Sequence, residues 1–282
     1  MKKNQRDNRS VFKADNAHLL LLIGVLLTTS SAFAAESKEP KPDGFLRSYS
    51  VLGLPLLADD ENLAIGLGVG FVTNPFKGVD DEILPFPDIS YQNGNFSIDL
   101  NEIGYAVYSQ ENCAITLLGS WRSAPYDSDD STYLHGMEKR DFVVEGGVSL
   151  TGETPVGTLG LMAMSDVTNN HKGQIVTAQY SISFGSESWG IEPVAGVSWQ
   201  SKKMVDYYYG VRQSEVRDDR PAYSGKSTFS PFIGLSGELK ISDHVVLQSG
   251  VNCEFMGSGI TDSPLIDDKY VLSGSVSLSY FF

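Results

Sequence analysis

Strict alternation of apolar and polar residues is the feature of this sequence that most constrains its fold. In the C-terminal stretch 270–282, Tyr270, Leu272, Val276 and Leu278 share one phase, while serines occupy most of the other. A period of two is the side-chain period of a β-strand, so this stretch predicts a strand with one apolar face. The same pattern recurs in segments of roughly ten residues separated by turn-forming residues, most clearly in 63–72, 141–151, 189–200 and 244–256.

Charged residues within the alternating segments all fall on the phase that carries glycine and serine. An apolar face without charge is either the core of a soluble β-sandwich or the lipid-facing side of a barrel. A sandwich surface is normally dense in Lys, Glu and Thr, whereas small residues on the polar phase suit the tapering interior of a closed barrel. The pattern therefore favours the barrel over the sandwich, and it predicts a lumen lined by Asp88, Asp99, Arg122, Glu145, Asp166, Glu192, Glu238, Lys240 and Glu254.

The lengths of the connections predict how the chain is threaded. Outer-membrane barrels have short periplasmic turns and longer outer loops, and tight turns such as Asn93-Gly94 and Ser242-Asp243 alternate here with longer connections. The stretch 94–110 is either one long strand or two short ones, 94–101 and 103–110, and the alternation requires two. We therefore predict an all-β fold: an antiparallel transmembrane up-and-down β-barrel of about twelve strands, with about ten as the alternative, ending in an aromatic C-terminal strand.

Two prolines do not fit regular pairing of the predicted strands. Pro193 and Pro231 lie inside predicted strands, where each removes a ladder hydrogen bond. We expect fraying or a bulge at these positions. The other predicted strands are 84–92, 112–122, 156–166, 173–184 and 228–240.

The N-terminus has the pattern of a secretory signal. A basic stretch is followed by the apolar run 19–27 and by Ala32-Phe33-Ala34, which predicts cleavage after Ala34. The apolar run is much shorter than the roughly 20 residues that a membrane-spanning helix needs. We expect a signal peptide at 1–34, a periplasmic N-terminal segment at 35–62 and an outer-membrane barrel at 63–282.

Composition excludes several other classes of protein. The chain has 35 Asp and Glu against 21 Lys and Arg, a net charge of −14, so it lacks the basic surface that a nucleic-acid partner requires. Two cysteines are too few for a disulfide-rich scaffold or a thiolate zinc site. The mean hydropathy of −0.12 is typical of a soluble protein, but an average over residues conceals alternation between them.

Several strings resemble the MipA/OmpV family of Gram-negative outer-membrane proteins: LPFPDISYQNGNF (84–96), YYYGV (207–211), RPAY (220–223) and DSPLI (262–266). The family motif residues are Tyr208, Tyr209, Gly210, Pro221, Tyr223, Ser263 and Pro264. The resemblance implies a protein without catalytic or cofactor-binding residues, and the family's namesake is a scaffold that joins a murein lytic transglycosylase to a penicillin-binding murein synthase. Other members look like porin-type or stress-related surface proteins. The terminal Tyr280 and Phe282 resemble the assembly signal that the barrel assembly machinery reads in outer-membrane barrels.

An acidic loop is the one candidate for metal binding. Asp127, Asp129, Ser131 and Glu138 occupy positions 1, 3, 5 and 12 of a calcium loop, although the glycine of position 6 is missing. The alternative is a solvated acidic loop, and we expect no dedicated metal site. The acidic outer loops could share divalent cations with lipopolysaccharide phosphates, so outer-membrane lipids and lipopolysaccharide are expected partners.

Two functions remain open at this stage. The first is a scaffold whose inner turns and N-terminal segment contact periplasmic murein hydrolases and synthases, as the resemblance implies. The second is a channel that prefers cations, because seven of the nine predicted lumen charges are acidic. A surface protein active in stress or adhesion is a further alternative that the resemblance leaves open.

Overall fold

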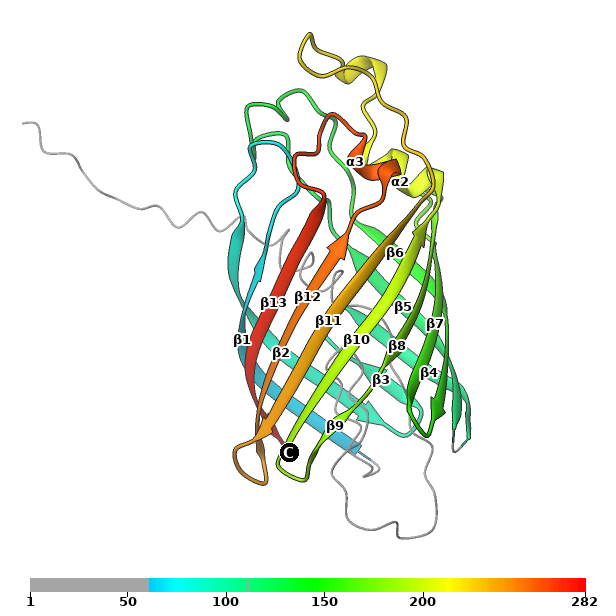
Figure 1. Ribbon diagram of the computed structural model, residues 1–282, viewed down its shortest axis with the longest axis vertical. Coiled ribbons are helices and arrows are strands. Elements are labelled where there is room, and N and C mark those ends of the chain that lie inside the picture. The colour runs from blue at the N-terminus through cyan, green and yellow to red at the C-terminus, as the bar shows by residue number, and fades with distance from the viewer. Residues whose placement is uncertain (1–60, 111) are drawn as a thin grey trace, which may run out of the picture.

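The computed structural model describes residues 61–110 and 112–282, which form one closed antiparallel barrel (Figure 1). Neighbouring strands pair in chain order, and β13 returns to pair with β1, so the sheet closes on itself. β8 and β9 are two parts of one interrupted strand, which makes a barrel of 12 strands. The strands are β1 Glu61–Val72, β2 Glu82–Asn93, β3 Phe96–Ile98, β4 Glu102–Gln110, β5 Cys113–Arg122, β6 Val143–Thr154, β7 Gly157–Asp166, β8 Gln174–Ser181, β9 Phe184–Ser186, β10 Trp189–Gln200, β11 Thr228–Lys240, β12 Val245–Phe255 and β13 Tyr270–Phe281.

The seam between β1 and β13 shows why alternation builds this wall. Leu67 pairs with Leu278 and Gly66 with Ser279, so apolar residues meet on one face and small residues on the other. The apolar face points outward, where Leu67 keeps 75% of its surface exposed. The serines of β13 point inward and Ser279 is buried. The predicted antiparallel barrel of twelve strands is confirmed, and the sandwich alternative is wrong.

The stretch 94–110 forms two strands, as the alternation of turns required, but the first is shorter than the prediction of 94–101. β3 ends at Ile98 because Asp99 reverses the chain. Its carboxylate accepts hydrogen bonds from the backbone N–H groups of Asn101 and Glu102, each at 2.8 Å. Within the described chain, β3 therefore covers only the last three residues of β2. No strand of the described residues lies beside the rest of β2 on that edge, where Pro85 and Pro87 lack N–H groups.

The two prolines within strands have different outcomes. Pro193 of β10 lies opposite the gap between β8 and β9, where the ladder stops at Val194 and Ser181 and resumes at Ile191 and Phe184. The missing N–H of Pro193 accounts for this break in the predicted strand 173–184. Pro231 remains in register with Val197 and causes no interruption.

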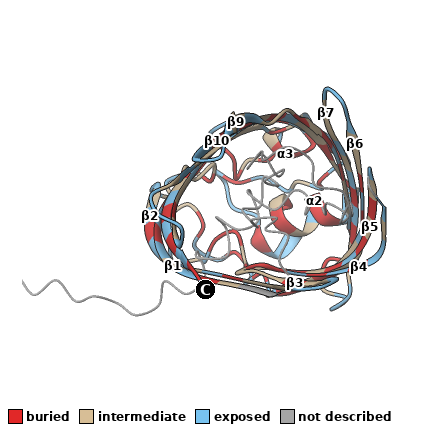
Figure 2. Ribbon diagram, turned by 90° about the horizontal axis from the view of Figure 1, so that it is seen from below, coloured by how far each residue is buried: buried red, intermediate tan, exposed pale blue. Residues whose placement is uncertain are grey.

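Helical turns occur only in the outer connections of the described chain. They are α2 Lys202–Tyr209, the 3-10 turn η2 Gln213–Glu215 and α3 Ser258–Thr261. Viewed along the barrel, α2 lies inside the ring of strands (Figure 2), and its Met204 and Val205 are buried. None of the helices in the described residues has the length and apolar character to cross a membrane. The expected signal peptide 1–34 and almost all of the expected segment 35–62 lie outside the described residues.

Gly147 of β6 tests how closely the strands and the lumen-facing side chains approach each other. A Cβ at this position would overlap the Ala163 carbonyl oxygen and the Met164 sulfur on β7. We expect Gly147→Ala to destabilise the barrel by about 1–3 kcal/mol through overpacking. Urea unfolding of the protein in lipid vesicles measures the change.

Gly250→Ala is the matched control, because a Cβ at Gly250 of β12 would have no neighbour closer than the Leu235 carbonyl oxygen at 4.0 Å. Equal destabilisation by the two substitutions would contradict the packing argument.

Candidate functional site: the outer cap and the lumen beneath it

Four outer connections fold together over one end of the barrel and bury an apolar core of their own. We call these connections, 73–81, 123–142, 201–227 and 256–269, the cap. Leu134, Val205, Ile260 and Leu265, one or more from each of three connections, have no more than a trace of exposed surface. Phe76 of the fourth stacks on Tyr209 with ring centroids 5.7 Å apart. Loops that shared no core would leave these residues exposed, so the cap is a folded unit.

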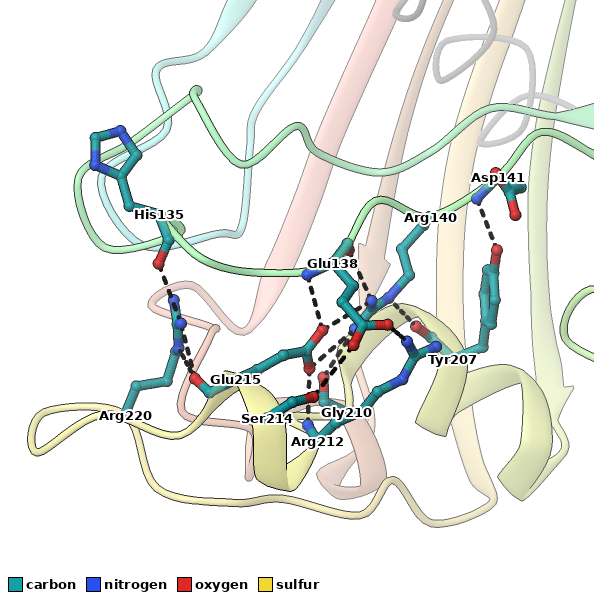
Figure 3. A network of polar contacts seen from close by, with 10 residues as sticks. All are labelled: His135, Glu138, Arg140, Asp141, Tyr207, Gly210, Arg212, Ser214, Glu215 and Arg220. Carbon is teal, nitrogen blue, oxygen red and sulfur yellow. Dashed lines mark hydrogen bonds and ion pairs between the residues drawn. The ribbon is translucent and has the colours of Figure 1, made fainter.

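A buried ion pair joins two of these connections (Figure 3). Arg140 Nη1 lies 3.0 Å from Glu215 Oε1, and the two side chains are 1% and 0% exposed. Arg140 Nε also donates to the Tyr207 carbonyl oxygen at 2.7 Å. The Glu215 carboxylate accepts hydrogen bonds from the backbone N–H of Glu138 at 2.9 Å and of Arg212 at 2.7 Å. Both charges therefore have partners in the other connection, and Glu215 has a further one in its own.

These contacts set the protonation of Glu215. Burial alone would raise the pKa of its carboxyl group, but the hydrogen bonds from Arg140 and from the Arg212 and Glu138 amides outweigh burial and lower the pKa below its ordinary value. Glu215 is ionised at neutral pH. Burial also raises the pKa of the nearby Tyr126 hydroxyl to about 12, although the charge of Arg140 acts in the opposite direction.

A second buried arginine holds the same segments in another way. Arg220 is 1% exposed and donates to backbone carbonyl oxygens: to Glu215 at 2.8 Å, to His135 at 3.2 Å and to Tyr133. Its guanidinium carbon also lies 5.9 Å from the centre of the Tyr133 ring. Arg220 thus fixes the path of the backbone at 133–135 against the 3-10 turn.

The family motif residues are gathered in the cap. Ser263 Oγ donates to the Tyr209 carbonyl oxygen at 2.6 Å, and the Tyr223 hydroxyl donates to the Gly259 carbonyl oxygen at 2.7 Å. A side chain at Gly210 would overlap the Asp206 carbonyl oxygen at the end of α2. The other motif residues are Tyr208, buried on α2, Pro221, exposed beside Arg220, and Pro264, which precedes the buried Leu265.

The residues expected to line the lumen are spread around the ring. Glu145 on β6 is their most connected member: its carboxylate lies 3.0 Å from Arg122 Nη2 and 3.4 Å from His171 Nε2. His171 Nδ1 accepts the Gly173 N–H at 2.8 Å, which leaves Nε2 to carry the proton that points at Glu145. Two others accept hydrogen bonds from serine hydroxyls: Asp88 from Ser279 at 2.5 Å and Glu192 from Ser183 at 2.7 Å. Asp99 and Asp166 accept hydrogen bonds from backbone N–H groups at the ends of strands, and Lys240 lies 3.5 Å from Asp243. Glu238 and Glu254 lie on β11 and β12.

A cavity of about 120 Å³ lies between the cap and the strands. Met204, Tyr208 and Tyr209 of α2 line its outer side. Its walls come from strands all around the barrel and include Glu102, Arg122, Glu145 and Glu254. Arg122 also lies under the Tyr208 ring, 6.0 Å from its centre. The cavity is the part of the lumen next to the cap, and cap residues line its outer side.

The acidic loop is not arranged as a metal site. Glu138 bonds Arg212 and, at 3.1 Å, Ser214, whereas Asp127 accepts hydrogen bonds from Ser128 and Asp129 within its own turn. Asp127, Asp129 and Glu138 are therefore not brought together, and the residues described contain no group of three or more ligands placed to hold a metal ion.

At the opposite end of the barrel, Tyr280 stacks on His244 with ring centroids 5.5 Å apart and contacts Phe282.

Comparison with known proteins places this architecture in a family. The family model described as MltA-interacting protein MipA matches residues 65–282. The chain belongs to the MipA family. It is 28% identical over 240 residues to the putative outer membrane protein YiaT of Escherichia coli, an alignment that covers 83% of this chain and 97% of the relative. It is 24% identical to the MltA-interacting protein of E. coli over 93% and 98% of the two chains, and 26% identical to OmpV of Vibrio cholerae over 74% and 82%.

Among solved structures, the translocator domain of the autotransporter NalP from Neisseria meningitidis is similar with a TM-score of 0.46 and 12% identity, covering 81% of this chain and 90% of that one. The family assignment that the motifs indicated is confirmed, and the relatives are outer-membrane proteins.

Sequence reasoning missed the residues that hold the cap together. Arg140, Glu215 and Arg220 lie in charge-rich loops, where a polar surface was expected. The signal that could have located Arg220 is its place at the start of the motif RPAY. Nothing in the local sequence distinguishes Arg140 from Lys139 beside it.

Removing Arg140 should open the cap. The substitution Arg140→Ala leaves Glu215 buried without its cation, which typically costs about 3–5 kcal/mol. We expect the loop 201–227 to become sensitive to protease in intact outer membranes while the barrel stays folded.

Arg212→Ala is the matched control, because Arg212 pairs with Glu138 at the surface, with side chains 47% and 52% exposed. Such a pair contributes at most about 1 kcal/mol, so protection should persist. Protease resistance in Arg140→Ala equal to that of the control would contradict the role of the buried pair.

Acid should open the cap through Glu215. Since the pKa of Glu215 is lowered in the folded cap, its stabilisation is complete above the ordinary glutamate pKa of about 4.3 and is lost as the pH falls through the lower folded value. Protease protection of 201–227, followed from pH 7 to pH 3 with an acid-stable protease, measures this. Glu215→Gln should lack that acid transition, and an unchanged transition would assign it to other groups.

Proposed function

We propose that this outer-membrane barrel is a scaffold that binds murein-remodelling enzymes at its periplasmic end. The observation that carries the proposal is the folded cap, because it lies over the outer end of the barrel and leaves the opposite end available for partners. The E. coli relative named MltA-interacting protein aligns along 93% of this chain. The proposed partners are a murein lytic transglycosylase and a penicillin-binding murein synthase.

The inner turns carry apolar residues that suit a docking role. Val156 lies in the β6–β7 turn and is 70% exposed, and Ile241 lies in the β11–β12 turn and is 57% exposed. Phe282, at the C-terminus of the described chain, is 69% exposed at the same end. The scaffold proposal assigns these three exposed apolar side chains to the contact with the partner enzymes. Some of this surface can also meet lipid headgroups, so the experiment has to separate the two.

Pull-down from solubilised envelopes tests the scaffold. The wild-type protein should enrich a lytic transglycosylase and a murein synthase over an unrelated barrel, and the double variant Val156→Glu/Ile241→Glu should lose at least about 90% of both, because two buried charges would abolish an apolar contact. Val216→Glu, at an exposed position in the cap, is the matched control and should retain binding. Absence of enrichment by the wild type would refute the scaffold.

A cation-preferring channel is the second candidate, favoured by the excess of acidic over basic residues among the expected lumen residues. The cap argues against it as the resting state. In planar bilayers we expect the wild type to be silent and Arg140→Ala to give steps selective for cations, because that variant releases the cap. Steady conductance of the wild type equal to that of the variant would favour the channel over the scaffold.

Four further assignments complete the proposal. Residues 1–34 act as a cleaved signal peptide, and 35–62 contribute to the periplasmic contact. Tyr280 and Phe282 are recognised by the barrel assembly machinery. The acidic outer surface contacts lipopolysaccharide through shared divalent cations, which the polar outer loops and the net charge of the chain support.

A further inference from the structure

Exposed lysines gather at the outer rim of the barrel, where β8, β10 and β11 meet the cap. One precedes β8, two belong to the first turn of α2 and one precedes β11; we call them the lysine cluster, and they are Lys172, Lys202, Lys203 and Lys226. The Gln174 N–H donates to Ser201 Oγ at 2.8 Å, and the Ser201 N–H donates to the Gln174 carbonyl oxygen at 2.9 Å. These hydrogen bonds hold the start of β8 against the start of α2.

Two glycines bring the remaining backbone of the cluster together. A Cβ at Gly173 would lie 2.6 Å from the Met204 backbone nitrogen, so the lysine that precedes this glycine is held beside α2. A Cβ at Gly225 would lie 2.5 Å from the Asp206 backbone nitrogen, so the lysine that follows it is held beside the same helix. Three segments distant in sequence therefore present their lysines around the first half of α2.

The positive charge of the cluster is not balanced by the protein. None of its four lysines forms an ion pair with a residue that the structure describes. Asp206 lies on the same helix, but one of its carboxylate oxygens accepts the Gly225 N–H at 2.7 Å. Like charges gathered in one place repel each other, and two of these lysines occupy the N-terminal turn of α2, where the helix dipole disfavours cations. An anion bound from outside the protein would relieve both costs.

The acidic residues of the outer connections gather on another part of the rim, over β13, β1 and β2. The Asp267 N–H donates to the Pro75 carbonyl oxygen at 2.9 Å, and Ser131 Oγ donates to the Lys77 carbonyl oxygen at 2.8 Å. These contacts bring together the acidic residues of three connections: Asp80, Asp81, Asp127, Asp129, Asp130, Asp267 and Asp268. The rim therefore has an acidic side and a basic side, although the chain as a whole has a net charge of −14.

Aromatic side chains indicate the depth of the lysine cluster in the membrane. Trp199 of β10 and Phe229 of β11 are paired across the two strands near their outer ends, and Phe229 is 63% exposed. Outward aromatic residues near strand ends form the girdles that mark the membrane interfaces of such barrels. Lys202 follows Trp199 by three positions, and Lys226 precedes Phe229 by three. The lysines therefore lie just beyond the girdle, at the depth of lipid headgroups.

We propose that the lysine cluster binds the phosphate groups of lipid A, the phosphorylated glycolipid that anchors lipopolysaccharide in the outer leaflet. The ammonium groups donate charge-assisted hydrogen bonds to the phosphate oxygens. The acyl chains of the lipid lie against Trp199 and Phe229, below the lysines. This contact is direct, so it differs from the contact through shared divalent cations proposed above for the acidic loops. It lies at the end opposite the proposed enzyme contact and is independent of the scaffold function.

Native mass spectrometry of the whole protein in detergent micelles tests the proposal, with bisphosphorylated lipid A as the probe and EDTA present throughout. We expect saturable binding by the wild type, and binding at least about tenfold weaker for lipid A without its phosphates. A lysine near an anionic lipid surface contributes about fivefold to binding, so Lys202→Gln/Lys203→Gln should weaken binding about twentyfold. Lys172→Gln/Lys226→Gln should weaken it to a similar extent.

Lys77→Gln/Lys269→Gln is the matched control, because it removes the same charge from the acidic side of the rim and should retain the affinity of the wild type. Heat-modifiable migration on gels shows that each variant is folded, and if one cluster variant fails to fold, the other decides.

Three results would each overturn the proposal: no binding by the wild type in EDTA, equal binding of the lipid without phosphates, or equal weakening by the control variant. The first of these would assign lipopolysaccharide contact to the shared cations of the acidic loops. Inorganic phosphate is added alone as a further probe. Saturation by inorganic phosphate as tight as by lipid A would assign the cluster to a soluble anion and would also overturn the proposal.

Discussion

Backbone hydrogen bonding is the constraint on which the whole structure depends. In the hydrocarbon region no water is present to pair with N–H and C=O groups, so a sheet that crosses a membrane must close. The return of β13 to β1 satisfies this condition, and everything else follows the resulting ring. Where the ladder of the described strands is incomplete, prolines reduce the number of unpaired donors. Pro193 faces the interruption between β8 and β9, and Pro85 and Pro87 lie on the edge of β2 that no described strand covers.

Closure of the ring also encloses an interior space, part of which the cap fills. A ring of this size encloses more space than its inward side chains fill, since about eight strands is the size that side chains alone can pack. Here the outer connections enter that space with a core of their own, and α2 lies within the ring (Figure 2). Met204 of α2 packs beside Val143 of β6, so the cap and the wall share apolar contacts.

The strands of the barrel wall could be predicted from sequence because apolar and polar residues alternate regularly along them. The place of a residue such as Leu278 or Ser279 in the alternation alone predicts whether its side chain points outward or into the barrel. Turn residues such as Asn93-Gly94 mark where a new strand begins. The cap could not be predicted in the same way, because it is built from single contacts between segments distant in sequence. Arg140 and Glu215 are 75 residues apart, and only the closed ring brings their loops together. The family motifs indicated that 207–211, 220–223 and 262–266 matter, but not that they form one packed unit. The end of β3 at Asp99 depended on a side chain that bonds its own backbone, which alternation does not encode.

Charges in the wall and in the cap have different physical roles. In the wall the charged side chains have polar partners on nearby strands and turns: Glu145 pairs with Arg122 and contacts His171, and Asp88 accepts a hydrogen bond from Ser279. In the cap, Arg140 and Glu215 are buried together, and such a pair stabilises little relative to apolar residues of the same size. Its effect is specificity: a bidentate cation and a carboxylate with fixed amide donors admit one arrangement of the loops, where methionine and leucine would admit several. A single arrangement is needed here, because Tyr208 and Met204 form the outer side of the cavity only when α2 sits in one orientation.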